Sequence, residues 1–104
     1  PLETVSVHDI VIDFRRHAVS CAGRSLDLSA TEFGLLALLA RSPGRVFSRA
    51  QIISAVKGHD YPVTERSVDV QMVGLRRKLG ERGDLIQTVR GVGYRMTEDP
   101  RSEQ

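Results

Sequence analysis

The spacing of the hydrophobic residues changes at Ser29, and this change constrains the fold more than any other feature of the sequence. Before Ser29, apolar and polar residues alternate, as at Val5, at Val7 and from Ile10 to Phe14. Alternation that is interrupted by turn residues such as Ala22-Gly23 predicts three or four short antiparallel strands. After Ser29, apolar residues recur every three or four positions, which is typical of amphipathic helices. Strands followed by helices predict an α+β fold.

Two segments with the pattern Ser-x-x-Glu or Ser-x-x-Gln predict the starts of two helices. They are Ser29-Ala30-Thr31-Glu32 and Ser48-Arg49-Ala50-Gln51. In such a segment the serine oxygen and the Glu or Gln side chain each accept a hydrogen bond from the other residue's backbone N–H. We expect the first helix to end at Ser42-Pro43-Gly44 and a third helix to run from near Thr64 to Leu79. The composition of Lys57 to Pro62 indicates a loop.

The end of the chain predicts a β-hairpin. Leu85 to Val89 and Tyr94 to Thr97 are rich in strand-forming residues. Between them, Arg90-Gly91-Val92-Gly93 provides two glycines that can adopt positive φ in a turn. We expect the polar tail from Glu98 to Gln104 to fray. Because the chain begins at Pro1 rather than Met, we expect it to be part of a longer protein.

Charge is distributed unevenly along the chain. Residues 1–40 carry three basic and five acidic side chains, whereas residues 41–95 carry eleven basic and five acidic ones. The first segment has a net charge of −2 and the second +6, and the tail contributes −2 to the overall +2. A strongly basic segment attracts polyanions, so nucleic acid is one candidate ligand of residues 41–95. An ordinary solvated basic surface is the alternative, and the acidic N-terminal sheet is predicted to be a scaffold.

Several classes of function are disfavoured by the sequence. Cys21 is the only cysteine, which excludes an intrachain disulfide and leaves no usual zinc-ligand set. His8, His17 and His59 lie in separate segments with no nucleophile–base pair, so we expect no enzyme activity, no metal site and no cofactor. The longest apolar run, Leu35 to Ala40, is far shorter than the about 20 residues that cross a membrane. We expect a cytoplasmic protein without a membrane partner.

The third predicted helix has two different faces at about 100° per residue. The core stripe is predicted to contain Val68, Met72, Leu75 and Leu79, and the outward face Arg66, Val70, Val73, Gly74 and Arg77. An outward face with basic ends and an apolar middle fits the major groove of DNA, where arginine contacts guanine or phosphate and valine can meet a thymine methyl. A protein interface and an ordinary exposed helix are the alternatives.

The predicted hairpin places Arg90 and Arg95 on either side of its turn. An arginine that projects from a thin hairpin can enter a narrow minor groove, where the negative potential is enhanced. Thr88 and Tyr94 can donate their hydroxyls to phosphates. Tyr94 is equally compatible with a place in the core. The hairpin therefore strengthens the prediction of DNA binding.

Five segments occur in the order and spacing of a known family. They are Thr31-Glu32-Phe33-x-Leu35-Leu36, Arg45-Val46-Phe47-Ser48-Arg49, Arg66-Ser67-Val68-Asp69-Val70, Leu75-Arg76-Arg77-Lys78-Leu79 and Gln87-Thr88-Val89-Arg90-Gly91-Val92-Gly93-Tyr94-Arg95. With them the chain resembles the C-terminal effector domain of OmpR/PhoB-family response regulators over residues 5–97, the expected ordered core of one domain spanning 1–104. The resemblance implies a winged helix-turn-helix fold, with an N-terminal four-stranded antiparallel sheet, three helices and a C-terminal β-hairpin wing.

The resemblance also implies a function and partners. It implies sequence-specific binding of duplex DNA as the output domain of a two-component regulatory system that controls transcription, with the third helix in the major groove and the wing in the adjacent minor groove. It implies a monomeric isolated domain that forms a tandem dimer on direct repeats, a receiver domain outside this chain, and a cognate histidine kinase. The loop from Lys57 to Val63, with Gly58, His59, Asp60 and Tyr61, matches the loop of the family that contacts RNA polymerase.

Eleven residues match the family's DNA-contacting positions. They are Arg66, Ser67, Val70, Gln71, Gly74, Arg76, Arg77, Lys78, Thr88, Arg90 and Tyr94. Lys57 and Arg49 are further candidate phosphate contacts, and Lys57 stands where relatives often have tryptophan. Asp69 is expected to hold a nearby arginine in place, because a carboxylate repels phosphate. Val73-Gly74 replaces a pair that is polar or basic in many members of the family.

Overall fold

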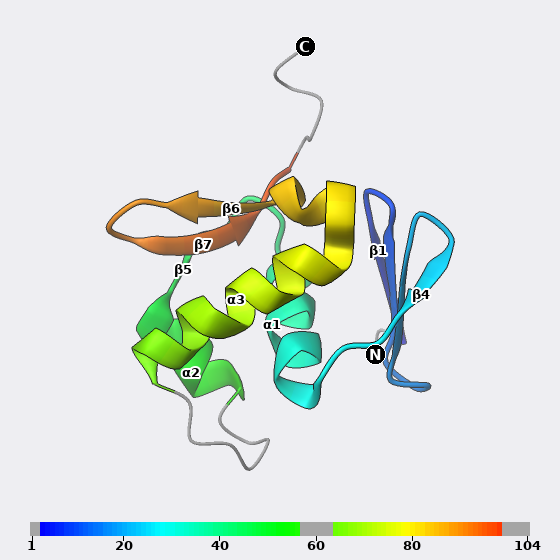
Figure 1. Cartoon of the computed structure of the whole chain (residues 1–104), viewed down its shortest axis with the longest axis horizontal. Coiled ribbons are helices and arrows are strands. Elements are labelled where there is room, and N and C mark those ends of the chain that lie inside the picture. Colours follow the sequence, from blue (N-terminus) through cyan, green and yellow to red (C-terminus); the bar gives the residue numbers. More distant parts are fainter. Residues whose placement is uncertain (1–2, 57–63, 99–104) are drawn as a thin grey trace.

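The N-terminal part of the chain is a four-stranded antiparallel sheet, as the alternation predicts. The computed structural model describes residues 3–56 and 64–98 (Figure 1). The strands β1 (Thr4–Val7), β2 (Ile10–Asp13), β3 (Ala18–Cys21) and β4 (Arg24–Leu26) pair in sequence order. Ala22 and Gly23 connect β3 to β4 with φ values of 52° and 82°. This left-handed conformation at both positions matches the twist that a two-residue hairpin requires.

Three α-helices follow in the described part of the chain: α1 (Ala30–Arg41), α2 (Arg49–Val56) and α3 (Glu65–Leu79). Both predicted capping boxes are confirmed. Ser29 Oγ accepts from the backbone N–H of Glu32 at 3.1 Å, and Glu32 Oε1 accepts from that of Ser29 at 2.9 Å. The corresponding distances for Ser48 and Gln51 are 3.1 and 2.8 Å. These bonds satisfy backbone donors that a helix leaves free at its start.

The predicted hairpin is confirmed, with small differences in its bounds. A 3₁₀ helix, η2 (Gly80–Leu85), follows α3 and was not predicted. Its last residue is Leu85, so the first hairpin strand, β6 (Ile86–Val89), begins one residue later than expected, and the second, β7 (Gly93–Met96), one residue earlier. A two-residue strand, β5 (Phe47–Ser48), pairs with the other side of β7 and completes a three-stranded sheet.

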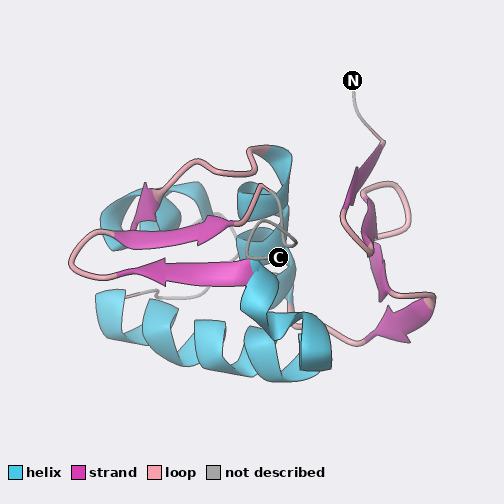
Figure 2. Ribbon diagram, turned by 90° about the horizontal axis from the view of Figure 1, so that it is seen from above, coloured by secondary structure: helices cyan, strands magenta, loops and turns pink. Residues whose placement is uncertain are grey.

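Helix α1 is the centre of the molecule. It contacts α2, α3, β1 and β7, so it lies between the N-terminal sheet and the two other helices. The views in Figures 1 and 2 show the hairpin running alongside α3, with the N-terminal sheet at the opposite end from the hairpin tip. Side chains from all these elements share one core, to which Leu36, Met72 and Met96 contribute fully buried side chains. This arrangement leaves one long side of α3 uncovered by other elements.

None of the helices in the described ranges is long and apolar enough to cross a membrane.

Candidate nucleic-acid interface

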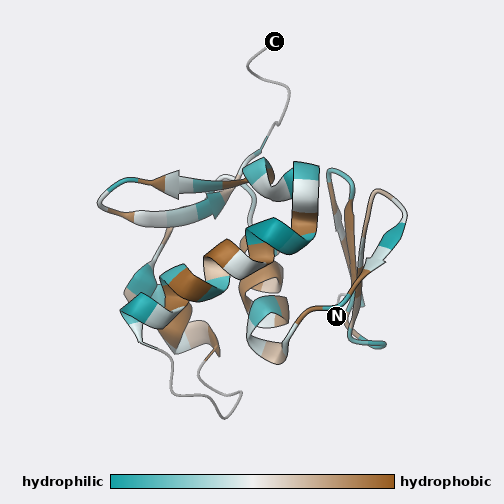
Figure 3. Cartoon of the chain, in the orientation of Figure 1, coloured by the Kyte–Doolittle hydropathy of each residue, from teal (hydrophilic) through white to brown (hydrophobic). Residues whose placement is uncertain are grey.

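One side of α3 is buried and the opposite side faces solvent, as the sequence predicts. All four residues of the predicted core stripe are buried. On the other side, Val70 and Val73 are 64% and 53% exposed, and Arg66 and Arg77 are exposed as well. These four residues, which we name the outer stripe, fall within a sector of about 60° at 100° per residue. Figure 3 shows the hydrophobic middle of α3 between its hydrophilic ends.

Gly74 does not belong to this outward side, so its predicted orientation was wrong. A Cβ atom added at Gly74 would lie 3.0 Å from Oε2 of Glu32, which means that this side of α3 faces α1. One turn further on, Lys78 donates from Nζ to Oε1 of Glu32 at 2.7 Å. The Lys78 ammonium, predicted as a DNA contact, therefore ties α3 to α1. Sequence reasoning missed this ion pair because its partners are 46 residues apart.

The carboxylate of Glu32 is buried, and its charge is stabilised by its hydrogen bonds. Burial by itself raises the pKa of Glu32, but the hydrogen bonds from Lys78 and from the backbone N–H of Ser29 outweigh that effect. The pKa of Glu32 is therefore below its ordinary value. The charged form of Glu32 is accordingly part of the stable fold.

A second cluster joins α2, α3 and β7. Asp69 Oδ1 accepts from Arg49 Nε at 2.7 Å and from the Tyr94 hydroxyl at 2.5 Å. As predicted, Asp69 holds an arginine in place. Tyr94 is only 5% exposed, which agrees with the core alternative, and its hydroxyl hydrogen points to Asp69 rather than to solvent. The hydrogen bonds from Tyr94 and Arg49 hold the pKa of Asp69 below its usual value, while burial and Asp69 raise the pKa of Tyr94.

Arg76 connects α3 to the hairpin. Its Nε and Nη2 donate to the carbonyl oxygen of Ile86 at 3.2 and 2.8 Å, and Nη2 also donates to Thr88 Oγ1 at 2.8 Å. The guanidinium lies 5.5 Å from the centroid of the Tyr94 ring, within cation–π range. Arg76 therefore fixes the position of β6 relative to α3, while the hydroxyl hydrogen of exposed Thr88 remains available for donation.

The hairpin tip is exposed and carries the guanidinium of Arg90. Arg90, Gly91 and Val92 are all exposed at the turn, and Gly91 has a φ of 77°. The tip lies at the same end of the molecule as the N-terminal end of α3 (Figures 1 and 2). No carboxylate among the described residues lies within ion-pair distance of Arg66, Arg77 or Arg90. Within the described part of the chain, these three cations therefore have no carboxylate partner.

Three further residues that the sequence analysis named are half-buried. Ser67 is half-buried, and its backbone N–H donates at 3.1 Å to Oγ1 of Thr64, the residue that caps the start of α3. Gln71 is half-buried beside the outer stripe. Arg95 of the hairpin donates from Nε to Gln87 Oε1 at 2.7 Å. Lys57 and the predicted polymerase-contact loop, Gly58 to Tyr61, lie outside the described residues.

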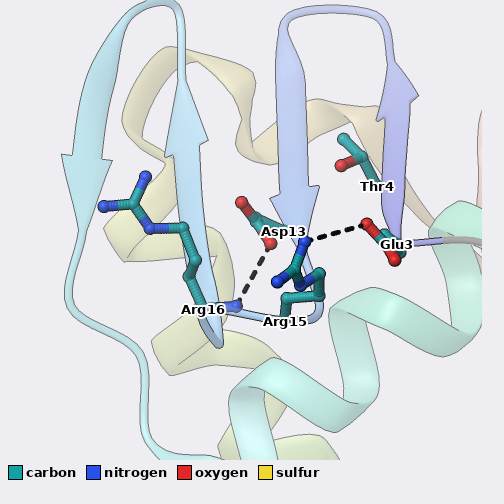
Figure 4. A pocket seen from close by; sticks show the side chains of 5 residues that line it. All are labelled: Glu3, Thr4, Asp13, Arg15 and Arg16. Carbon is teal, nitrogen blue, oxygen red and sulfur yellow. Dashed lines mark hydrogen bonds and ion pairs between the residues drawn. The ribbon is translucent and has the colours of Figure 1, made fainter.

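A pocket on the N-terminal sheet has no excess of positive charge. The pocket shown in Figure 4 lies on the N-terminal sheet, where Arg15 pairs with Glu3 at 3.5 Å and Asp13 accepts from the backbone N–H of Arg16 at 3.1 Å. Its charges therefore compensate one another. Within the described ranges, no three His, Cys, Asp or Glu side chains are grouped to hold a metal ion.

The chain matches known transcriptional regulators over most of its length. The family model described as "Transcriptional regulatory protein, C terminal" matches residues 23–96. The phosphate regulon transcriptional regulatory protein PhoB of Rhizobium meliloti is 49% identical over 88 residues, which is 83% of this chain and 39% of PhoB. The chain belongs to the OmpR/PhoB family. This effector domain spans about two-fifths of the length of that relative.

Solved structures agree that the domain is a winged helix. The DNA-binding domain of AdeR, in complex with an intercistronic region, is similar with a TM-score of 0.80 and 31% identity, over 90% of this chain and 99% of that one. The DNA-binding domain of Klebsiella pneumoniae RstA, in complex with the RstA box, gives a TM-score of 0.79 and 31% identity, over 94% and 100%. In this fold the hairpin of β6 and β7 is the wing.

The cluster around Asp69 gives a first testable prediction. Tyr94→Phe removes the hydroxyl donor and leaves the ring in place, so we expect the pKa of Asp69 to rise and the free energy of unfolding to fall by about 1 kcal/mol. NMR titration of the Asp69 carboxyl carbon and urea denaturation measure the two effects. The control is Asp84→Asn, since Asp84 is exposed on η2 and this change should alter neither quantity. An unchanged pKa would contradict the hydrogen bond.

Proposed function

We propose that this effector domain binds duplex DNA sequence-specifically as the output domain of a two-component response regulator that controls transcription. Helix α3 lies in the major groove and the wing enters the adjacent minor groove. The observation that carries the proposal is the position of Arg66, Arg77 and Arg90 on an uncovered helix side and on the neighbouring wing tip, where none of them has an ion-pair partner among the described residues. Cations spread along the helix and the wing can contact successive phosphates of a DNA backbone. The exposed side of α3 fits the major groove.

The proposal divides the predicted contacts into two groups. The outer stripe, Thr88 and Arg90 face the DNA, with Ser67, Gln71, Arg49 and Lys57 as contacts at the edge. Arg76, Lys78 and Tyr94 position the helix and the wing through their bonds to Ile86, Glu32 and Asp69. The AdeR domain was solved in complex with an intercistronic region and the RstA domain in complex with the RstA box, which supports the same role here.

The proposal also covers the context of the domain. In the full-length cytoplasmic protein, a receiver domain phosphorylated by a cognate histidine kinase brings two effector domains together on direct repeats. The isolated domain is monomeric, and the loop with Gly58 to Tyr61 contacts RNA polymerase. The 39% of PhoB that this chain matches leaves room for a receiver domain in a protein of that length.

The exposed Val70 and Val73 favour a second candidate function, in which the apolar middle of α3 binds another protein. This alternative predicts DNA binding that is weak and independent of sequence. Selection of bound duplexes from a random pool at near-physiological salt separates the two functions. Enrichment of a defined sequence arranged as direct repeats supports the proposed function, and a pool without enrichment contradicts it.

Neutralising the wing arginine tests the groove contact directly. For Arg90→Gln we expect about tenfold weaker binding to the selected duplex and a salt dependence reduced by about one ion, because one cation–phosphate contact is lost. Fluorescence anisotropy at several salt concentrations measures both. The control is Arg15→Gln in the exposed turn between β2 and β3, which should change neither value. Equal effects of the two substitutions would show that Arg90 acts only through net charge.

A further inference from the structure

The middle of the outer stripe offers only methyl groups to a ligand. Val70 and Val73 lie one turn apart and are largely exposed, between the two arginines at the ends of the stripe. Gly74 has no side chain, and a Cβ atom at this position would face Glu32. Between Arg66 and Arg77, the centre of the outer stripe therefore presents no side-chain hydrogen-bond donor or acceptor.

Such a surface discriminates between base pairs by their apolar groups. The only apolar group on a base edge in the major groove is the 5-methyl of thymine, whereas the other edges present donors and acceptors. A donor or acceptor that is pressed against a valine loses water without gaining a partner, which is unfavourable. Contact between valine and thymine instead removes apolar surface of both groups from water. Valines in the groove therefore favour thymine.

We infer that Val70 and Val73 select thymine, through its 5-methyl group, at two positions in the site bound by each domain. This inference rests on the proposed function, in which α3 enters the major groove. The arginines at the ends of the stripe hold the helix to the DNA backbone, and the valines supply selection at the centre. Val73 is 53% exposed and Val70 64% exposed, so each valine can reach a separate base pair.

Deoxyuridine provides the test, because it lacks only the 5-methyl group of thymine and keeps its pairing edge. Each thymine of the selected duplex is replaced singly by deoxyuridine, and the dissociation constant is measured by anisotropy at fixed salt. We expect about fourfold weaker binding at two thymines per domain, as expected for one buried methyl group. Val70→Ala should remove the loss at one position and Val73→Ala at the other. The control Val11→Ala changes an exposed valine on β2 and should keep both losses.

The outcomes separate the inference from the function on which it rests. Tight binding to an enriched sequence with no loss for any deoxyuridine overturns the inference and leaves the proposed function intact. Losses that persist in a Val70→Ala, Val73→Ala double variant also overturn it, because the methyl groups would then be contacted by other residues. Absence of any enriched duplex in the selection overturns both.

Discussion

Gly93→Ala is expected to destabilise the domain by about 3 kcal/mol or more, which is a large part of the total stability of a small domain. A Cβ atom at Gly93 would lie 1.9 Å from the carbonyl oxygen of Phe47 and 2.9 Å from Cα of Ser48. Both atoms belong to the backbone of β5, which pairs with β7 at this point. Since backbone atoms cannot move aside as a flexible side chain does, β5 has to separate from β7. Urea denaturation followed by circular dichroism measures the loss.

Gly91→Ala is the matched control for this substitution. Gly91 lies two residues earlier in the same wing, and no atom comes within 4 Å of a Cβ atom added there. Its φ of 77° makes alanine unfavourable by about 1–2 kcal/mol. The Gly93 variant should therefore be clearly less stable than the Gly91 variant. Equal stabilities would show that β5 does not approach β7 as closely as described.

Local features of the fold could be predicted from the sequence because neighbouring residues determine them. The capping box at Ser29, the buried stripe of α3 and the glycine-containing turn of the wing each depend on a few adjacent side chains. Strand β5 could not be predicted in this way. It has only two residues, so alternation gives no signal, and its pairing with β7 joins parts of the chain more than 40 positions apart.

The candidate site shows the same division between local and long-range information. Helical spacing correctly placed Val70 and Val73 on the exposed side of α3. It failed for Gly74, because an angle on a helical wheel does not show that α1 packs against that edge of α3. The roles of Arg76 and Lys78 were equally hidden, since both side chains are held by partners on other elements. A basic residue near the exposed side of α3 can thus serve to hold the fold together.

Lys78→Met is expected to lower the free energy of unfolding by about 2–3 kcal/mol at pH 7. Removing one partner of a buried ion pair leaves the other charge uncompensated, at a cost of about 3–5 kcal/mol. The cost here is smaller because the Lys78 side chain is 42% exposed and solvent screens its charge. Methionine keeps the apolar part of the side chain. The control is Arg77→Met, the neighbouring exposed residue, which should change stability by less than about 0.5 kcal/mol.

The destabilisation by Lys78→Met should depend on pH in a defined direction. In the native protein the pKa of Glu32 is lowered, so its contribution to stability is present above the unfolded-state pKa of about 4.3 and disappears as the pH falls through the folded-state value. Without Lys78, burial still disfavours the Glu32 carboxylate, and protonation relieves that cost. The two proteins should therefore differ most above about pH 5 and converge towards pH 3. Urea denaturation at pH 7, 5, 4 and 3 measures the convergence. A constant difference would assign the effect to the packing of the Lys78 side chain rather than to its charge.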